Sequence, residues 1–460
     1  MSAGTSDFVA TFLDQENAAN PWISALSNGM NWITYSSETT VIAYYLADDE
    51  TLPDPAFSGQ EIGFNAWSAA ERSAIFRVME TYEHMLNVKF VPVENMNDAQ
   101  IIWGAADTST WAVFDLYPTS KGVTIAIQDG QTIPDPERAD ADQLAIVINQ
   151  GIYGEDVSGL NAGGFNYRTM LHELGHALGL AHPHPDDIRD EVYFPGVFES
   201  EETPGVFDYG DMALNQGIYT VMSYNRGWNT GPDGREPGTD PDNFDFGIEG
   251  TPMALDIATL QAIYGANENY NVGDNVYWLN DAADVGAHFS AIWDTGGSGT
   301  IAYGGTRDAF IDLRAATLEG YGAGGFVSYV RNDDGVWSGY TIAHGVTIEN
   351  ARGGSGNDSI LENQAANILT GGQGADSFVF RAGGGHDTIT DFSGHWAQGD
   401  FIDLMFLPSI RSFGDFDIIS VNDGLDTLLR FTENDTVLLS GVDIGLLNPQ
   451  DFRFLPLGEM

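Results

Sequence analysis

Residues 172–182 read HELGHALGLAH, and this stretch decides how the rest of the chain is interpreted. His172 and His176 are four residues apart, so on a helix both imidazoles project from one face and can share a metal ion. Glu173 is placed to reach a water held by that ion. Gly179 can adopt a positive φ and end the helix, which turns the chain so that His182 returns as a third ligand. Three neutral imidazoles leave one open position on a tetrahedral Zn²⁺, which is typical of catalytic zinc sites.

A second short pattern, TVMSY, occupies residues 220–224. Met222 can form an apolar floor beneath the imidazoles, and Tyr224 can bring its hydroxyl near the metal. Methionine and tyrosine are common core residues, so this pattern is specific only in combination with the histidine motif.

Charge and composition exclude several classes of function. The chain has 460 residues, with 67 acidic and 17 basic side chains and a formal net charge of -50. Such a chain repels nucleic acid and anionic lipid, so neither is an expected partner. The acidic residues either keep the protein soluble in a salty medium or serve as ligands for Ca²⁺, and both interpretations stay open.

The sequence also lacks cysteines, a membrane span and an N-terminal secretory signal, and each absence limits what the protein can be. No cysteine is present, which excludes disulfides and thiolate zinc sites. No apolar run is long enough for a membrane span, so none is expected. The first residues lack the basic region and apolar core of a secretory signal, so the protein either stays inside the cell or carries its export signal elsewhere.

The N-terminal half predicts a mixed α/β domain that leads into the histidine motif. Residues 1–30 carry little pattern and are interpreted as an N-terminal extension or a short pro-segment, and the catalytic domain is predicted to span residues 31–265. Ser68 and Glu71 form a capping box in front of a long amphipathic helix. Asn166 is the predicted N-cap of the histidine helix. The strands expected here are 41–46, 88–93, 101–103, 123–127 and 144–148.

Residues 111–117, WAVFDLY, suggest a binding hypothesis. An edge strand beside a metal cleft could pair with an extended peptide through its unpaired backbone groups. An ordinary strand inside the sheet explains the same residues equally well. His184, which lies between two prolines after a complete motif, is not expected to bind the metal.

Beyond Gly265 the composition changes to glycine and aspartate, and residues 266–460 are predicted to form a second domain. Residues 353–361 and 371–379 both fit the nine-residue pattern GGxGxDxUx, where U is apolar. Residues 362–370 are a degraded copy between them, with Asn367 in the aspartate position. Turns 18 residues apart stack on one side, so Asp358 and Asp376 can hold Ca²⁺ between them. The carbonyls expected to complete the site are those of Gly354, Gly356, Gly372 and Gly374.

Downstream of these repeats, short strands alternate with turns. Strands are expected at 387–392, 400–404, 426–431 and 436–442, and they form a β-sandwich that closes the open end of the parallel β-roll.

In combination, these motifs resemble a serralysin-type metzincin, a secreted bacterial zinc endopeptidase with a C-terminal calcium-binding RTX β-roll. The resemblance runs from about residue 33 to the end of the chain. It is closest at the histidine motif, at the Met222–Tyr224 turn, at residues 256–267 and at residues 345–350. It implies an α+β metzincin catalytic domain, with a mixed sheet and two long helices, followed by an all-β parallel β-roll and β-sandwich domain.

The resemblance also implies roles for individual residues. His172, His176 and His182 would bind zinc, Glu173 would be the general base, and Tyr224 would be a catalytic residue and a movable zinc ligand. A further calcium site is implied upstream of the repeats, where Gly299 replaces the usual aspartate and removes one carboxylate. Its expected ligands are Asp294, Gly296, Gly297, Thr347 and Glu349.

The expected protein is therefore a secreted, extracellular zinc endopeptidase that cleaves extended protein segments, is stabilised by Ca²⁺ and acts as a monomer. A family member of this kind is exported by a one-step transporter that reads an uncleaved C-terminal signal. Two alternatives stay open. One is a calcium-dependent extracellular binding protein with a vestigial protease fold, and the intact Glu173 speaks against it. The other is a metalloprotease of narrow specificity.

Overall fold

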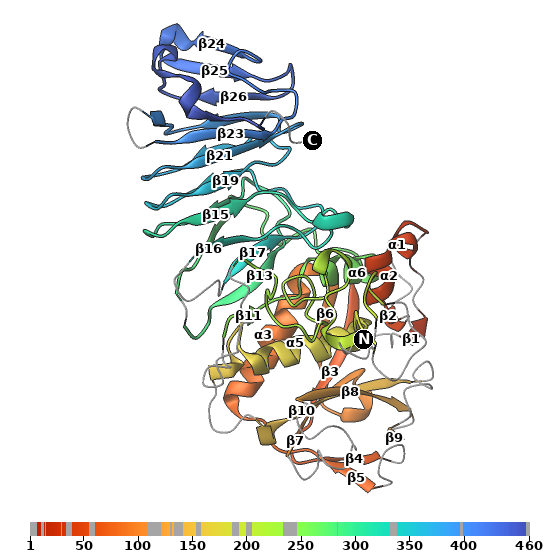
Figure 1. The fold of residues 1–460 in the computed structure, drawn as a ribbon. Coiled ribbons are helices and arrows are strands. Elements are labelled where there is room, and N and C mark those ends of the chain that lie inside the picture. The colour runs from red at the N-terminus through yellow and green to blue at the C-terminus, as the bar shows by residue number, and fades with distance from the viewer. Residues whose placement is uncertain are drawn as a thin grey trace. The chain divides into compact units, whose positions relative to one another are not determined.

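The computed structural model (Figure 1) describes most of the chain. The described residues are 7–10, 13, 15–28, 30–33, 39–54, 60–107, 121–128, 131–132, 141–152, 158–185, 193–198, 205–232, 246–282, 284–331, 338–395 and 399–456. They belong to two compact units. The first unit falls within Met1–Glu268, Asp284–Ala291 and Leu318–Gly324, and the second within Asn269–Ala283, Ile292–Thr317 and Gly325–Met460.

The first unit is built on a mixed sheet in the order β6-β3-β7-β10-β8-β9. Strands β6, β3, β7 and β10 pair in parallel, whereas β8 runs antiparallel to β10. Every residue of β10 is buried, which explains why its central residues 144–148 form an unbroken apolar run rather than an alternating one. The strands are β3 (Thr40–Leu46), β6 (Val88–Pro92), β7 (Ile101–Ala106), β8 (Gly122–Gln128), β9 (Gln131–Thr132) and β10 (Gln143–Asn149).

Helix α3 begins with the capping box that the sequence predicts. The Ser68 hydroxyl accepts the Glu71 N–H, and the Glu71 carboxylate accepts the Ser68 N–H. The Tyr82 hydroxyl on α3 donates to the Leu171 carbonyl at 2.8 Å, which ties α3 to α5. The helices of this unit are α1 (Gln15–Ala19), α2 (Pro21–Leu26), α3 (Ala69–Met85), α5 (Phe165–Leu178) and α6 (Ala254–Tyr264).

Short strands complete the first unit. Strand β1 (Asp7–Ala10) pairs with β2 (Met30–Ile33), β4 (Thr51–Asp54) pairs with β5 (Gln60–Gly63), and β11 (Ile248–Glu249) pairs with β13 (His288–Ile292). Part of the segment interpreted as an extension is packed into this unit, because Trp22, Ile23 and Leu26 are buried.

The second unit contains two ladders of short, mostly parallel strands. One ladder runs β17-β16-β15-β19-β21-β23-β27, and the other runs β12-β14-β18-β20-β22-β26-β25-β24. Figure 1 shows β15, β19, β21 and β23 stacked as successive rungs. The strands are β12 (Val276–Trp278), β14 (Thr300–Ala302), β15 (Ala309–Asp312), β16 (Ser328–Val330), β17 (Gly339–Ile342), β18 (Asn350–Arg352), β19 (Ser359–Leu361), β20 (Ile368–Thr370), β21 (Ser377–Arg381), β22 (His386–Ile389), β23 (Phe401–Phe406), β24 (Asp417–Val421), β25 (Asp426–Arg430), β26 (Thr436–Leu439) and β27 (Phe452–Arg453).

The 18-residue spacing of the repeats appears directly in the strand register. Ile360 of β19 pairs with Phe378 of β21, and Ala351 of β18 pairs with Leu369 of β20. Ile360, Leu369 and Phe378 occupy the apolar position of the three nonamers, and all are 0% exposed. The predicted stacking is confirmed, including that of the degraded middle copy.

The mixed sheet followed by a β-rich C-terminal part agrees with the coarse organisation expected from the sequence. Among the described residues, no helix is both long enough and apolar enough to cross a membrane.

Candidate metal centre

Helix α5 carries the histidine motif and ends where the sequence predicts. Gly179 adopts φ 114° and ψ 11°, a left-handed conformation that stops the helix after Leu178. The predicted start is wrong, because Gly164 rather than Asn166 is the N-cap, and Asn166 lies inside the first turn. A Cβ on Gly164 would lie 2.5 Å from the Gly159 carbonyl oxygen, so the helix entry is packed too closely for a side chain.

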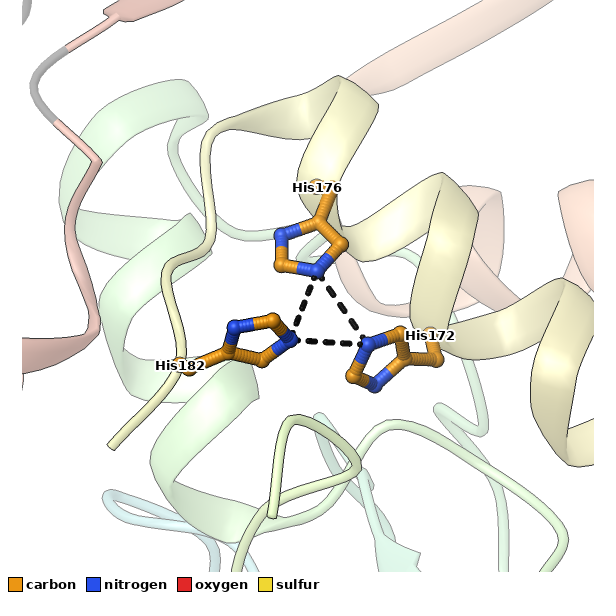
Figure 2. Close-up of side chains that lie close together, drawn as sticks. All are labelled: His172, His176 and His182. Atoms are coloured by element: carbon orange, nitrogen blue, oxygen red, sulfur yellow. Dashed lines mark hydrogen bonds between the residues drawn. The ribbon is translucent and has the colours of Figure 1, made fainter. Parts of the chain in front are cut away.

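The three histidines of the motif converge on one point (Figure 2). The Nε2 atoms of His172, His176 and His182 are 3.1 Å apart in each pairing. The Nδ1 atom of His172 lies 2.8 Å from the Val221 carbonyl oxygen, and that of His176 lies 2.9 Å from the Leu180 carbonyl oxygen. Because a carbonyl oxygen only accepts, both Nδ1 atoms carry the hydrogen, and the corresponding Nε2 atoms present lone pairs.

Lone pairs that face one another at this distance attract a cation rather than form hydrogen bonds. A tetrahedral Zn²⁺ about 2.0 Å from each nitrogen needs N···N separations of about 3.3 Å, close to those observed. Burial and the nearby Arg168 guanidinium hold the pKa of His172 well below its usual range, which keeps this imidazole neutral and able to bind metal. The trio therefore fits zinc.

Glu173 is buried beside the trio and is held by strand β8. The Thr124 hydroxyl lies 2.9 Å from Glu173 Oε2 and 3.0 Å from the Glu173 carbonyl oxygen, so it can donate to either. A Cβ on Gly122 would lie only 2.7 Å from Glu173 Cγ, so the strand passes at a distance that only glycine permits. Neither Gly122 nor Thr124 was predicted to belong to the site, because the strand pattern does not reveal which helix the strand touches.

The residues 220–224 form a turn under and beside the imidazoles. Met222 is 0% exposed, and its sulfur would lie 3.0 Å from a Cβ on Gly175 of α5. The Tyr224 ring is 43% exposed, with its centroid 4.9 Å from that of His182 and 5.9 Å from that of His172. The His184 ring stacks on that of His182, with centroids 5.0 Å apart, and is not part of the converging trio.

Buried charged residues fix this turn. None of them was assigned a role in the site from the sequence, although residues 256–267 belong to the stretches of closest resemblance. Asp256 of α6 accepts the Thr220 hydroxyl at 2.6 Å and the Val221 N–H at 2.8 Å. Burial raises the pKa of Asp256 to about 7 despite these hydrogen bonds. Arg168 donates through Nη2 to the Val221 carbonyl, which His172 also contacts. No local motif marks these residues, because their partners lie far away in the sequence.

In the second unit, the predicted calcium aspartates form a ladder of side chains. Asp358 Oδ1 accepts the Ala309 N–H at 2.7 Å, and Asp376 Oδ1 accepts the Asp358 N–H at 2.8 Å. Asp400, which sequence reasoning missed, accepts the Asp376 N–H at 3.0 Å. The Asp376 Oδ2 atom is buried without a hydrogen-bond partner, and burial raises the pKa of Asp376 to about 7. The negative charge of these carboxylates is therefore poorly balanced by hydrogen bonds from the protein alone.

The glycine turns beside this ladder stack closely on one another. Gly372 and Gly374 have φ of 102° and 120°, values that favour glycine. A Cβ on Gly372 would lie 2.1 Å from the Gly354 carbonyl oxygen, and one on Gly374 would lie 1.9 Å from that of Gly356. All four predicted glycines therefore meet in successive turns near Asp358 and Asp376.

The remaining predicted calcium residues are engaged differently. Asp294 accepts the Tyr277 hydroxyl at 2.6 Å and the Gly296 N–H at 3.1 Å, while Glu349 accepts the Gly299 N–H at 2.7 Å. Gly297 has φ 92°, and the Thr347 side chain is exposed.

Asn367, in the degraded repeat, accepts the Asn363 N–H and donates to the Glu349 carbonyl. Within the described residues, only the histidine trio brings three His, Cys, Asp or Glu ligand atoms within 4.8 Å of one another.

A helix with two converging histidines, a third beyond a left-handed glycine and an adjacent buried glutamate defines a candidate metal centre of the HExxHxxGxxH type. Comparison with known proteins agrees. Residues 254–452 match the family model described as "Peptidase M10 serralysin C terminal". The matched stretch begins at helix α6 and lies in the C-terminal part of the chain, which is thus similar to the C-terminal part of serralysin-type peptidases.

Several curated relatives align with the chain. Serralysin of Photorhabdus luminescens is 30% identical over 317 residues, which cover 66% of this chain and 55% of that protein. Metallopeptidase AprA of Pseudomonas marginalis is 28% identical over 384 residues, covering 79% of this chain and 66% of that protein. The chain thus spans a little over half the length of the first of these relatives.

Solved structures give weaker matches. A hatching enzyme zinc-protease from the medaka fish Oryzias latipes is 16% identical, covering 52% of this chain and 95% of its own, with a TM-score of 0.26. The AlgE6R2 subunit of a mannuronan C5-epimerase from Azotobacter vinelandii is 20% identical, covering 41% and 93%, with a TM-score of 0.19. TM-scores this low carry no inference.

Proposed function

We propose that the protein is a secreted zinc-dependent endopeptidase of the metzincin class, with a calcium-binding RTX β-roll in its C-terminal part. The observation that carries the proposal is the convergence of three Nε2 atoms beside the buried Glu173 carboxylate. His172, His176 and His182 would hold the ion. A bound Zn²⁺ would supply Lewis acidity that acidifies water and polarises a peptide carbonyl.

The Glu173 carboxylate would act as the general base. It takes a proton from the attacking water and later delivers it to the leaving amine as general acid. The Thr124 hydroxyl and the close passage of Gly122 hold this carboxylate in one orientation, so little reorganisation is needed when the proton moves. The site is therefore arranged for hydrolysis rather than for structural metal binding.

Tyr224 would contribute in two ways. Its ring lies beside His172 and His182, and its exposure leaves the side chain room to turn. In one position its hydroxyl would be an additional zinc ligand. In another it would donate a hydrogen bond to the oxyanion that develops on the attacked carbonyl. The substrate itself would be an extended segment of an extracellular protein.

Calcium would stabilise the second unit. The buried, unpartnered Oδ2 of Asp376 and the neighbouring Asp358 form a site that a hard divalent cation suits, with the carbonyls of the stacked glycine turns. Asn367 would contribute a weaker position in the degraded repeat. The upstream ligands would be Asp294, Gly296, Gly297, Thr347 and Glu349, with one carboxylate fewer because Gly299 has no side chain.

Location and partners follow from the same proposal. A protein of this kind would leave the cell through a one-step transporter that reads a C-terminal signal, and its β-roll would bind Ca²⁺ outside. It would act as a monomer on protein substrates.

The test is casein hydrolysis by the zinc-loaded protein and its Glu173→Ala variant. We expect hydrolysis to disappear in Glu173→Ala while the zinc content stays at one ion per chain. Glu94→Ala, which changes an exposed carboxylate on the same unit, is the matched control and should leave activity intact. Hydrolysis that survives in Glu173→Ala would contradict the assignment of the base. A zinc-loaded wild-type protein that cleaves no peptide in a library would favour a binding protein.

A further inference from the structure

At the end of helix α5 and in the turn after it, a run of backbone carbonyls is bonded by donors from other parts of the chain. Those of His176, Ala177, Leu178, Gly179 and Leu180 all accept hydrogen bonds from donors outside α5. The Tyr264 hydroxyl of α6 donates to Leu178, at 2.8 Å. The four other carbonyls are reached by Asn28 and Trp32, from the N-terminal segment.

Asn28 provides the largest share of these donors. Its backbone N–H donates to the Gly179 carbonyl at 2.8 Å. Its side-chain Nδ2 lies 3.2 Å from the His176 carbonyl oxygen and 3.3 Å from the Leu180 carbonyl oxygen. The Trp32 indole donates to the Ala177 carbonyl at 2.9 Å. One asparagine therefore contacts three carbonyls across the turn that separates the second histidine from the third.

The Leu180 carbonyl is shared between Asn28 and the metal centre. It accepts from Asn28 Nδ2 and also from Nδ1 of His176, at 2.9 Å. The hydrogen bond to Nδ1 is what places the His176 lone pair on Nε2, toward the trio. Any displacement of the Leu180 carbonyl would release both contacts together.

The neighbours of Asn28 hold the same turn from the other side. Ser27 forms an antiparallel bridge with Leu180, and the Ala181 N–H donates to the Leu26 carbonyl at 2.8 Å. Ala181 immediately precedes His182. Leu26 is 0% exposed, so the bridge is anchored in the core through α2.

We propose that Asn28 is a positioning residue of the metal centre. Its side-chain amide acts through the Leu180 carbonyl to orient His176, while its backbone N–H holds the Gly179 carbonyl in the turn that leads to His182. Residues 26–28 thus belong to the site rather than to a removable extension. This inference rests on the proposed zinc site, but it does not require that the protein be a protease.

The test compares Asn28→Ala and Asn28→Leu with the wild-type full chain. Asn28→Leu keeps the shape of the side chain and its neutral charge but removes both amide donors. Asn95→Ala is the matched control, because Asn95 is an exposed residue of the same unit whose side chain caps a turn by accepting the Asn97 N–H at 3.2 Å. Zinc affinity is measured by competition with a chelator, and the ligand field is followed by the visible absorption of the Co²⁺-loaded protein.

We expect the zinc dissociation constant of both Asn28 variants to rise about 10- to 100-fold, as for other residues that orient metal ligands. We also expect the Co²⁺ spectrum to change and kcat to fall with KM nearly constant. Zinc affinity and a Co²⁺ spectrum equal to those of Asn95→Ala would overturn the proposal, even if the melting temperature fell. Because both readouts are independent of hydrolysis, they hold if the wild-type protein proves inactive, in which case only the proposed function fails.

Discussion

Arg168 and Glu249 form a buried ion pair, with 3.2 Å between Arg168 Nε and Glu249 Oε2 and side-chain exposures of 7% and 0%. Arg168 lies one turn before His172 on α5, and its Nη2 donates to the carbonyls of Val221 and Ser223. Glu249 Oε1 accepts the Gly227 N–H at 2.6 Å. The pair therefore joins the histidine helix to both ends of the turn that carries Tyr224.

Removing one member of this pair should destabilise the first unit. Glu249→Leu leaves the Arg168 guanidinium buried without its carboxylate partner. Removing one member of a buried ion pair lowers the free energy of unfolding by about 3–5 kcal/mol. We expect a large drop in melting temperature for this variant. The double variant Arg168→Met/Glu249→Leu should recover much of that loss, because no charge is left buried. A double variant that is as unstable as the sum of the single variants would show that the two side chains act independently.

The sequence predicted the local parts of this site and missed the distant ones. The histidine spacing and Gly179 act within one helix and its end, so they can be interpreted from eleven residues. Arg168 and Glu249 are 81 residues apart, and nothing near either residue indicates the other. Asn28 lies in a stretch without hydrophobic period, because its role is to donate to carbonyls rather than to pack.

The Tyr224 hydroxyl can be tested by Tyr224→Phe. The ring contacts with His182 and His184 do not depend on the hydroxyl, so the fold and the zinc content should be unchanged. Loss of a donor to an oxyanion costs about 10²- to 10³-fold in kcat. We therefore expect a fall of this size in kcat, with KM within about twofold. Tyr321→Phe, at a tyrosine that is 72% exposed, should change neither constant. A loss confined to KM would assign Tyr224 to substrate binding.

Gly122→Ala tests how β8 supports Glu173. The new Cβ would lie 2.7 Å from Glu173 Cγ and 2.9 Å from Thr169 Cγ2, closer than real contacts allow. Glu173 must shift, so kcat should fall about tenfold or more while zinc stays bound, because misplaced catalytic groups lose rate steeply. Gly63→Ala is the control, since its Cβ would meet nothing within 4 Å. Unchanged kcat in Gly122→Ala would mean that the strand adjusts without moving the base.

In the C-terminal half, the strands of the repeats could be predicted from the sequence, whereas the short strands before them could not. The repeat period is itself the strand register, so the pairing of Ile360 with Phe378 follows directly from the sequence. Strands β12, β14, β15, β16 and β17 were not predicted, because each has only three or four residues. Segments that short show no clear alternation, and their partners come from other rungs of the ladder.

Buried carboxylates should make the metal-free protein sensitive to pH. Burial, reinforced by repulsion from Asp435, raises the pKa of Glu362 from 4.5 to about 8 and that of Asp387 from 3.8 to about 7. In the unfolded chain both groups lose their protons at lower pH. Between the unfolded and folded pKa values the folded state binds more protons, so its stability falls as pH rises.

In EGTA we therefore expect the melting temperature of the second unit to fall steadily between pH 4.5 and pH 8. Calcium should reduce the part of the slope that comes from Asp376, whose pKa burial also raises to about 7, because the bound ion would neutralise that carboxylate. Glu362→Gln, which keeps the shape of the side chain but cannot ionise, should raise the melting temperature at pH 8 in EGTA and flatten the slope. Glu433→Gln, at an exposed position, should do neither. A Glu362→Gln protein whose melting temperature at pH 8 matches that of Glu433→Gln would show that Glu362 is compensated in some other way, since its buried Oε2 would then carry no electrostatic cost.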